Sequence, residues 1–461
     1  MIKFLMKCCK FNFGEFEEQE FRKFIRLGFI YFMVVGIYWI IRPLKDSVFA
    51  QLVGAEYIPF AKTVSLCLMI PFVAIYTKLI SMYPREKITS IIPTFYGIAI
   101  CVFACVIFLC QDGIYTNSIG KSIVGYIWYF FVESWASVVF AMFWAICTDV
   151  TDPKTAKRGF PLVYFVGQIA GIITPVLITG MPKRLGLQTD FLSLITAGIA
   201  AFIMITVTKY FFKATPKELL VAFESEEDKK KAAKEKEAKG KKPGFTEGIK
   251  LLFSHKYLMG IFFAILMFEL ITTIFDYNFK MAAAKVYSGT ELSKYLGEYG
   301  SCVNIITVLF LLLGISNISR FLGLGIALIC TPLLLGCALF GFLALDSLNF
   351  LFVLMVSSKA INYALNNPSL KQLYIPTSES ARFKAQAWIE AFGGRIAKEA
   401  GSVFNMTLLP LKAAFGELAG KAYYLTLTGV VGYPLIVLWI IVAVYLGKTC
   451  KKASDEKKVV C

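Results

Sequence analysis

Two positive charges, Arg395 and Lys398, lie within an apolar segment that is long enough to cross a membrane. A charge at the depth of the bilayer core costs at least ~2.5–3.5 kcal/mol on insertion scales, so each cation requires compensation. The two residues are three positions apart, which places them on one face of a helix. This pattern indicates an interior cavity that binds an anion.

The chain also contains a neutral copy of this charged segment. Residues 167–171 read Gly-Gln-Ile-Ala-Gly, and residues 394–398 read Gly-Arg-Ile-Ala-Lys. Each copy has a Lys ten residues upstream of its first glycine. Gln168 therefore stands where Arg395 stands in the other copy, which indicates a duplicated chain with one neutral and one charged half.

The composition is that of a membrane protein with many spans. Of the 461 residues, 57% are hydrophobic and 17% are charged, and the mean hydropathy is +0.66. A soluble domain cannot bury that much apolar surface. Apolar runs of about 20 residues, the length of one helical span, predict twelve transmembrane helices. The runs are 25–41, 59–82, 88–110, 123–148, 160–181, 190–212, 257–279, 296–315, 322–344, 349–372, 386–409 and 424–447.

These helices form two groups of six on either side of one long polar segment. We predict an N-terminal six-helix bundle at 1–212, a cytoplasmic linker at 213–256, a C-terminal six-helix bundle at 257–448 and a cytoplasmic tail at 449–461. The charged linker is typical of a solvated spacer, and a regulatory or partner-binding role stays open. A parallel repeat of six helices is the arrangement of major-facilitator transporters, whose sites lie between the halves near the midplane.

Lys and Arg residues predict the orientation, because cytoplasmic loops of membrane proteins carry an excess of them. They cluster before the first predicted helix, after the fourth and at the end of the chain, so both termini and the linker are expected in the cytoplasm. The net charge of +17 reflects this excess together with the intramembrane cations, and no nucleic-acid partner is predicted. The first apolar run is expected to be a retained helix rather than a cleaved signal peptide.

No residue pattern indicates covalent chemistry or a cofactor. The twelve Cys are scattered through apolar runs as small hydrophobic residues, and the single His, His255, argues against a metal site. The motifs of P-loop ATPases, serine hydrolases and zinc proteases are absent from the sequence. We therefore expect no enzyme activity, no cofactor and no metal.

Charged residues in other apolar runs are further candidate site residues, because a charge in the membrane must face a partner or water. Arg42 and Lys45 share one face at the end of the first predicted helix, which Pro43 is expected to bend. Glu133 lies in the middle of the fourth predicted helix. The alternatives are an interfacial, snorkelling pair for Arg42 and Lys45, and a purely structural ion pair for Glu133.

The second half carries charges in three predicted helices. Asp276 and Lys280 are four residues apart in the seventh helix and can pair locally. Lys359 lies in the middle of the tenth helix, and Glu390 lies two turns before Lys398 in the eleventh. Among these intramembrane charges the cations outnumber the acids, so the predicted cargo is a multivalent anion. Phosphate groups suit both Arg and Lys.

Several motifs, taken in their order along the chain, resemble those of a known family. They are Arg-Pro-Leu-Lys-Asp at 42–46, Pro-Phe-Ala-Lys-Thr at 59–63, Glu-Ser-Trp at 133–135, Tyr-Ile-Pro at 374–376 and the charged segment at 393–398. In order and spacing they resemble the nucleotide transporter (ATP:ADP antiporter) family of obligate intracellular bacteria and plastids. The resemblance runs from the first predicted helix to the eleventh. It implies a major-facilitator-like fold, exchange or proton-coupled uptake of nucleotides, and a location in a bacterial inner membrane.

The resemblance also implies roles for individual residues. The family's transport residues fall on Lys45, Glu133 and Lys398. Its acidic position in the seventh helix falls on Asp276, and a nearby family Lys falls on Lys280.

The chain departs from the family pattern in three places. Residues 367–370 read Asn-Pro-Ser-Leu instead of Asp-x-Thr-Lys, residues 397–400 read Ala-Lys-Glu-Ala instead of Gly-Lys-Ser-Gly, and Gln168 replaces a frequent Asn. These departures keep the cations that would bind phosphate. They loosen the tie to strict ATP:ADP exchange, since paralogues in the family carry other nucleotides.

Taken together, the sequence predicts an all-α polytopic membrane protein that transports nucleotides by alternating access, through ATP/ADP-type exchange or related uptake. The expected substrate-binding residues are Arg42, Lys45, Glu133, Gln168, Asp276, Lys280, Lys359, Arg395 and Lys398. The expected partners are a nucleotide, the lipid bilayer, and protons or a counter-substrate, and the chain is expected to act as a monomer. Two alternatives stay open. One is a proton-coupled importer of a different organic anion with Glu133 or Asp276 as proton carrier, and the other is a receptor or scaffold without transport.

Overall fold

The structure is a computed structural model, and it falls into two compact units that are described one at a time. It describes residues 16–83, 85–114, 116–151, 153–220, 250, 252–313, 322–345, 347–378, 386, 389, 393–456 and 459–460. Within these residues the regular structure is helical, without strands. Unit 1 comprises Met1–Lys236 and Ala284–Ser301, and unit 2 comprises Glu237–Ala283 and Cys302–Cys461.

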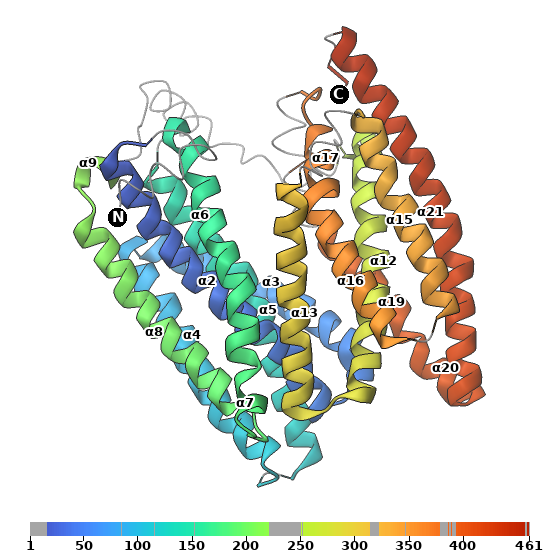
Figure 1. Ribbon diagram of the computed structural model, residues 1–461, viewed down its shortest axis with the longest axis horizontal. Helices are drawn as coiled ribbons and strands as arrows, with labels where there is room; N and C mark the ends of the chain where they lie inside the picture. The colour runs from blue at the N-terminus through green and yellow to red at the C-terminus, as the bar shows by residue number, and fades with distance from the viewer. Residues whose placement is uncertain are drawn as a thin grey trace. The chain divides into compact units, whose positions relative to one another are not determined.

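Unit 1 is a bundle of long apolar helices (Figure 1). The long helices are α2 (Glu18–Leu52), α3 (Ile58–Met82), α4 (Arg85–Gln111), α5 (Ser118–Asp149), α6 (Pro153–Thr174) and α8 (Phe191–Ala214). The shorter segments are η1 (Ala55–Tyr57), η2 (Pro175–Thr179), α7 (Met181–Arg184) and α9 (Lys217–Leu220).

Helix α2 is the centre of unit 1. It packs against α5, α6 and α8, while α3 packs against α5 and α4 packs against α8. Small residues allow the closest approach, since a side chain added at Gly167 of α6 would collide with the ring of Tyr31 on α2. Farther along the same seam, Thr174 Oγ1 of α6 donates to the carbonyl of Gly36 on α2 at 3.2 Å. The apolar faces of these helices therefore meet along most of the length of α2.

The first half of α13 (Gly289–Leu312), up to Ser301, groups with unit 1. Ser301 Oγ donates to the carbonyl of Ile172 on α6 at 2.7 Å. A side chain added at Gly300 would lie 2.6 Å from the ring of Trp39 on α2. These close contacts explain why residues up to Ser301 group with unit 1.

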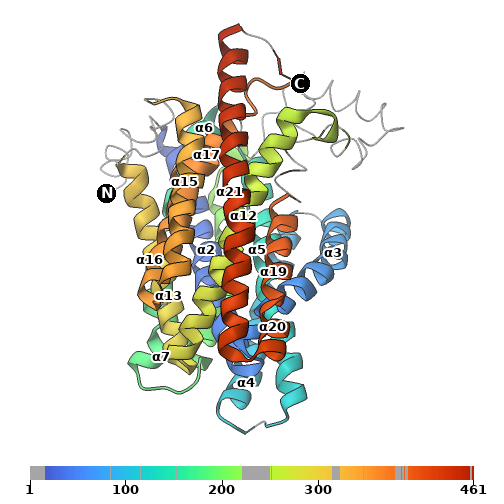
Figure 2. The same ribbon diagram turned by 90° about the vertical axis from the view of Figure 1, so that its right-hand side faces the viewer.

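Unit 2 is a second helical bundle, and its longest helix is α21, with 40 residues (Figure 2). Its helices are α12 (Lys256–Val286), the second half of α13, α15 (Leu324–Ala344), α16 (Leu348–Ile361), α17 (Asn367–Gln372), α19 (Gly394–Met406), α20 (Leu408–Phe415) and α21 (Glu417–Glu456). A π-helical turn, η4 (Asn362–Asn366), joins α16 to α17.

Two glycine contacts mark close seams between helices of unit 2. A side chain added at Gly447 of α21 would lie 2.6 Å from the Cα atom of Gly325 on α15, so these two backbones touch. At Gly401 of α19, an added side chain would lie 2.8 Å from Cβ of Thr273 and 2.9 Å from the carbonyl oxygen of Leu270, both on α12. Helix α19 is thereby packed directly on α12.

The two copies of the glycine-rich segment have the same place within their own unit. The neutral copy lies on α6, which packs on α2, the first long helix of unit 1. The charged copy lies on α19, which packs on α12, the first long helix of unit 2. This local equivalence supports a duplication of the chain.

The predicted fold class is confirmed, with one difference in the number of spans. Ten helices of the described residues are long and apolar enough to cross a membrane, against the twelve predicted. Helices α13 and α19 lie in the two remaining predicted runs, 296–315 and 386–409. Most of the predicted linker 213–256 lies outside the described residues, and α21 continues to Glu456, into the predicted tail. The predicted division of the chain stays a prediction.

Candidate functional site

In unit 1, a lysine and a glutamate from different helices form an ion pair. Lys45 lies near the C-terminal end of α2, Glu133 lies near the middle of α5, and Lys45 Nζ donates to Glu133 Oε1. The Lys45 side chain is 7% exposed, whereas the Glu133 side chain is 40% exposed. The pair therefore joins a buried cation to a carboxylate that is still accessible from outside the packed helices.

Further groups surround the ammonium group of Lys45. The ring of Tyr129, one turn before Glu133 on α5, lies 4.2 Å from Nζ, and Asp46 Oδ1 lies 4.0 Å from it. Trp128 Nε1 donates to the carbonyl oxygen of Leu44 at 3.3 Å and so fixes α5 against α2 at this level. A buried ammonium group requires such partners, because its desolvation must be offset.

Arg42 lies one turn before Lys45 and rests on aromatic rings. Its guanidinium carbon lies 4.8 Å from the centre of the Trp39 ring and 5.5 Å from that of Tyr38. Cation–π contacts of this kind contribute about 0.5–1 kcal/mol at exposed sites. A stacked guanidinium can still direct N–H groups at a phosphate in a fixed plane, which an ammonium group cannot do. Arg42 and Lys45 thus present two kinds of cation on one face of α2.

In unit 2, three charged residues share one face of α12. Glu269, Asp276 and Lys280 follow one another at intervals of seven and four residues, so they line up along the helix. Lys280 Nζ lies 2.7 Å from Asp276 Oδ2, and both side chains are largely buried. The local pair that the four-residue spacing predicted is present.

Lys398 of α19 pairs with the first of these acids. Its Nζ atom lies 3.6 Å from Glu269 Oε2, and the Lys398 side chain is 58% exposed. Arg395, one turn earlier on α19, is also exposed. Glu269 was not among the predicted site residues, although its spacing of seven from Asp276 indicates that both side chains lie on the same face of α12.

A chain of buried hydrogen bonds fixes α19 between α12 and α21. Asn278 Nδ2 on α12 donates to Tyr424 OH at 3.1 Å, and Tyr424 OH on α21 donates to Asn405 Oδ1 on α19 at 2.7 Å. Asn405 Nδ2 then donates to the carbonyl of Thr273 on α12 at 3.2 Å. Because these buried hydrogen bonds join three helices, the network holds α19, and with it Lys398, in one register against α12.

The remaining predicted residues lie on other helices or outside the described part of the chain. Gln168 is half-buried on α6 beside Gly167, which packs on Tyr31, roughly 20 Å along α2 from Lys45. Lys359 is half-buried near the end of α16, just before η4. Glu390 lies outside the described residues. The structure therefore brings together Lys45 with Glu133 and Asp276 with Lys280, and it keeps Gln168 away from Lys45.

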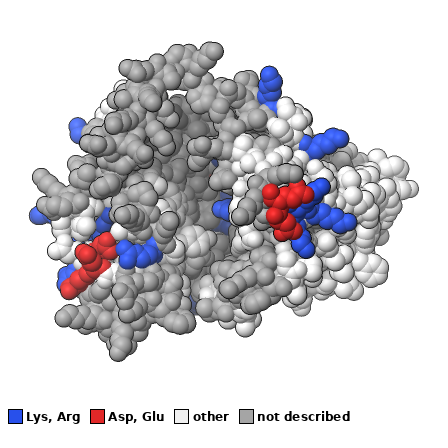
Figure 3. Space-filling model, turned by 90° about the horizontal axis from the view of Figure 1, so that it is seen from above, with Lys and Arg blue, Asp and Glu red and all other residues white. Residues whose placement is uncertain are grey.

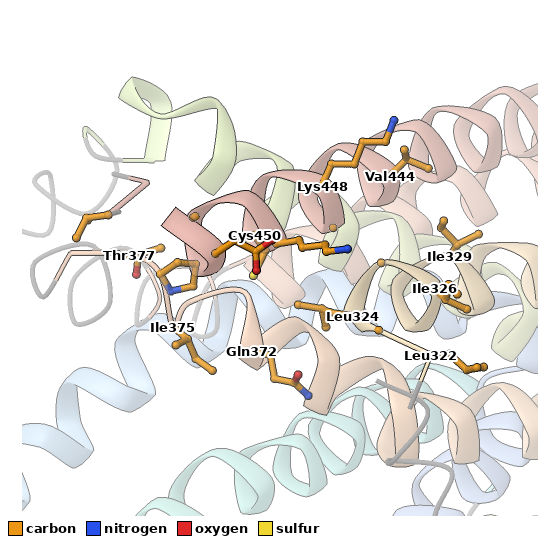
Figure 4. A pocket seen from close by; sticks show the side chains of 18 residues that line it. Leu322, Leu324, Ile326, Ile329, Gln372, Ile375, Thr377, Val444, Lys448 and Cys450 are labelled. Atoms are coloured by element: carbon orange, nitrogen blue, oxygen red, sulfur yellow. The ribbon is translucent and has the colours of Figure 1, made fainter. Parts of the chain in front are cut away.

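A cavity of about 870 Å³ lies elsewhere in unit 2, between the start of α15, the end of α17 and the last turns of α21 (Figure 4). Its lining is mostly apolar, with Gln372 and Lys448 among the polar residues. Beside it, the backbone N–H of Val460 donates to the carbonyl of Pro376 at 2.9 Å, so the end of the chain folds back onto this region. None of the predicted substrate-binding residues lines this cavity.

The surface seen in Figure 3 carries charged side chains in small groups of both signs. An extended surface of positive charge, which binding to the nucleic-acid backbone requires, is not visible among the described residues of this face.

Comparison with known families gives a match over nearly the whole chain. A family model described as TLC ATP/ADP transporter matches residues 4–126, 119–350 and 350–450. ADP,ATP carrier protein 1 of Rickettsia typhi is 25% identical over 476 residues, which cover 94% of each chain. ADP,ATP carrier protein 4 of Rickettsia felis is 27% identical over 450 residues, which cover 85% of each chain.

Solved structures with the same fold are transporters with little sequence identity to this chain. A bacterial homologue of the iron transporter ferroportin, in an inward-facing state, has a TM-score of 0.59 at 13% identity, covering 92% of this chain and 98% of that one. A peptide transporter, POT, has a TM-score of 0.58 at 12% identity, covering 93% and 95%. At this level of identity the likeness concerns the fold alone.

Proposed function

We propose, from the premise that this chain belongs to the TLC ATP/ADP transporter family, that it exchanges nucleotides across a membrane by alternating access. The premise rests on the family match from residue 4 to residue 450. The proposal adds the mode of transport and the residues that perform it.

One observation carries the proposal: each unit holds a lysine that is paired with a carboxylate from a neighbouring helix. These pairs are Lys45 with Glu133 in unit 1 and Lys398 with Glu269 in unit 2. A phosphate oxygen makes the same contacts with an ammonium group as a carboxylate oxygen does. A nucleotide would therefore compete with Glu133 and Glu269 for their lysines, with Arg42 as an additional phosphate ligand in unit 1.

This competition supplies a basis for exchange. With no cargo, the acids hold the lysines and stabilise one state of the carrier, and phosphates that take the lysines release it. A ligand shifts a conformational equilibrium only through different affinity for the two states, and partner exchange at Lys45 and Lys398 provides that difference. An empty carrier then returns slowly, so uptake requires nucleotide on the other side.

Location, orientation and assembly complete the proposal. The protein would lie in a bacterial inner membrane with both termini and the central linker in the cytoplasm, as the distribution of Lys and Arg favours. It would function as a monomer.

The test is uptake into proteoliposomes that contain the purified full-length protein. Labelled ATP, ADP and other nucleotides are supplied outside, with vesicles that contain nucleotide, a pH gradient, both or neither. We expect uptake that depends mainly on internal nucleotide. Uptake of no nucleotide under any condition would refute the function.

Proton-coupled import is the second candidate, favoured by the accessibility of the Glu133 carboxylate. If a pH gradient alone drives uptake, and Glu133→Gln abolishes that drive, Glu133 is a proton carrier and symport replaces exchange.

A further inference from the structure

Unit 1 contains a second buried polar cluster, separate from Lys45 and Glu133, where α2 and α4 end and where α8 and α13 begin. Its centre is Asp190, the residue before α8, whose side chain is fully buried. Gln111 is the last residue of α4, and Gln51 lies one residue before the end of α2. Asp190 is the N-cap residue of α8, but its carboxyl group makes no capping hydrogen bond.

Gln111 forms a hydrogen bond with one oxygen of the Asp190 carboxyl group, and the other oxygen has no hydrogen-bond partner among the described residues. Gln111 Nε2 donates to Asp190 Oδ2 at 2.9 Å and to Gln51 Oε1 at 2.8 Å, which uses both of its hydrogens. Gln111 Oε1 accepts from the backbone N–H of Asp190 at 2.8 Å. Asp190 Oδ1 is buried and has no hydrogen-bond partner among the described residues.

The start of α13 closes the cluster. Ser293 and Ser47 are both fully buried, and their hydroxyl oxygens lie 2.7 Å apart. One turn away, Thr290 Oγ1 donates to the carbonyl of Leu187, in the segment that leads to Asp190. Residues from α2, α4, α8 and α13 therefore shield the Asp190 carboxyl group from water.

No cation compensates this carboxyl group among the described contacts. The titratable and charged groups at this end of the surrounding elements include Lys45, Asp46, Glu56, Cys110, Asp112, Lys121, Lys183, Arg184, Glu291, Lys294, Tyr295 and Glu298. The nearest basic residues along the chain are occupied elsewhere: Lys183 pairs with Glu291, and Arg184 donates to the carbonyl of Val176 at 2.7 Å. Lys294 pairs with Glu298.

Burial raises the pKa of the Asp190 carboxyl group above its ordinary value. The polar groups of Gln111, Ser293 and Gln51 lower it in part, and of these contacts only the one from Gln111 has the geometry of a hydrogen bond. The positive end of α8 also favours the charged form, but without a capping hydrogen bond its effect is weak beside complete desolvation.

We propose that Asp190 is a proton-binding site, which carries a proton while α2, α4, α8 and α13 are packed around it and releases the proton when this end of unit 1 opens to water. Burying one oxygen without a hydrogen bond costs far less free energy for a neutral carboxylic acid than for a carboxylate, which would be an uncompensated charge. Acid pH therefore favours the packed arrangement. Alkaline pH favours the open one, because a deprotonated Asp190 must either stay buried as a charge or reach water.

Proton release rests on the proposed transport function, because alternating access is what would open this end of unit 1 to water. Proton binding itself does not depend on transport. It follows from the burial and contacts of Asp190 alone.

The direct test is infrared difference spectroscopy of the purified full-length protein in lipid, titrated from neutral to alkaline pH. We expect the C=O band of a buried protonated carboxylic acid near neutral pH in the wild type and in Asp112→Asn. Asp112 is the matched control, because it directly follows Gln111 in the chain and is exposed. The band should be lost in Asp190→Asn, which keeps the size and shape of the side chain.

A second variant keeps the test decisive if Asp190→Asn fails to fold. Gln111→Asn shortens the donor to Asp190 Oδ2, so the same band should shift in position while remaining present. A wild-type protein without such a band, or a band that neither variant changes, overturns the proton site whether or not the protein carries nucleotides.

The coupling to opening is measured separately, as the pH dependence of nucleotide exchange. We expect exchange by the wild type to change between neutral and alkaline pH and exchange by Asp190→Asn to lose that change. A full wild-type pH dependence in Asp190→Asn would overturn the coupling, and the infrared band would still decide the proton site.

Discussion

Two lysines with the same proposed role lie in different surroundings. Lys45 is buried with the Glu133 carboxylate, the Tyr129 ring and Asp46 close to its ammonium group, whereas Lys398 is mostly exposed beside Glu269. Removing a partner from a buried pair destabilises a protein, while an exposed pair contributes about 0–1 kcal/mol. Substitutions at the two lysines should therefore separate effects on folding from effects on transport.

Lys398→Ala should nearly abolish nucleotide uptake while leaving the thermal midpoint of unfolding almost unchanged. The reason is that the exposed pair with Glu269 adds little to stability, whereas the cation is proposed to bind phosphate. Uptake is measured in proteoliposomes, and unfolding is followed on the detergent-solubilised protein. Lys452→Ala is the control, since Lys452 forms an exposed pair with Glu456 at 4.0 Å on α21. Wild-type uptake by Lys398→Ala would refute its role.

Glu133→Gln should weaken exchange, leave some nucleotide binding, and also lower stability. The substitution leaves the buried ammonium group of Lys45 without its carboxylate, and the loss should be about 1–3 kcal/mol because Glu133 itself is partly exposed. Adding Lys45→Met should restore stability but not transport, because both charges are then absent. A double variant that regains exchange would show that the pair is purely structural.

The candidate residues could be predicted from the sequence, because a charge within an apolar run is costly in a membrane and is retained mainly where it has a function. Their partners could not all be found that way. Helical spacing revealed Asp276 with Lys280, since both lie on α12. The partner of Lys398 lies on another helix and was Glu269, and burial at Asp190 depends on four converging helix ends. Such contacts between helices depend on packing, which the sequence pattern does not contain.

At the scale of helices, apolar length predicted most of the elements, while glycines determine how closely they pack. Apolar length does not assign α13 to a bundle: its apolar run is continuous, yet the residues up to Ser301 group with unit 1. Small residues such as Gly300, which face the ring of Trp39, decide this membership. The length of an apolar run predicts that a helix is present, whereas close contacts with neighbouring helices determine the bundle in which it packs.

Gly447→Ala should lower the thermal midpoint of unfolding, whereas Gly325→Ala should not. A side chain at Gly447 would lie 2.6 Å from the Cα atom of Gly325, but one at Gly325 would lie 3.8 Å from the Cα atom of Gly447, at ordinary contact distance. Overpacking of such a seam costs about 1–3 kcal/mol. Equal effects of the two substitutions would show that α15 and α21 do not meet with this geometry.

For the whole molecule, composition and the spacing of apolar runs were sufficient to predict a polytopic helical membrane protein. The orientation is a further prediction from the Lys and Arg distribution, and it can be measured by labelling with a membrane-impermeant thiol reagent. Asp112→Cys, in the connection after α4, should be labelled in intact cells. Lys452→Cys, near the end of α21, should be labelled only after the cells are opened. The reverse pattern would contradict the orientation. Mass analysis of the labelled peptides separates these sites from the native cysteines.

The hydrogen bond from the Val460 N–H to the Pro376 carbonyl also matters for anyone who attaches a reporter to this protein. A fluorescent protein or an affinity tag fused after residue 461 would lie next to this hydrogen bond. Such a fusion is expected to disturb the Tyr374–Pro376 turn. An insertion at Gly113 should disturb the structure less, because this residue lies in an exposed connection with no atom within 4 Å of an added side chain. A short epitope inserted there should report the protein's abundance without disturbing the part of unit 2 that lines the cavity between α15, α17 and α21.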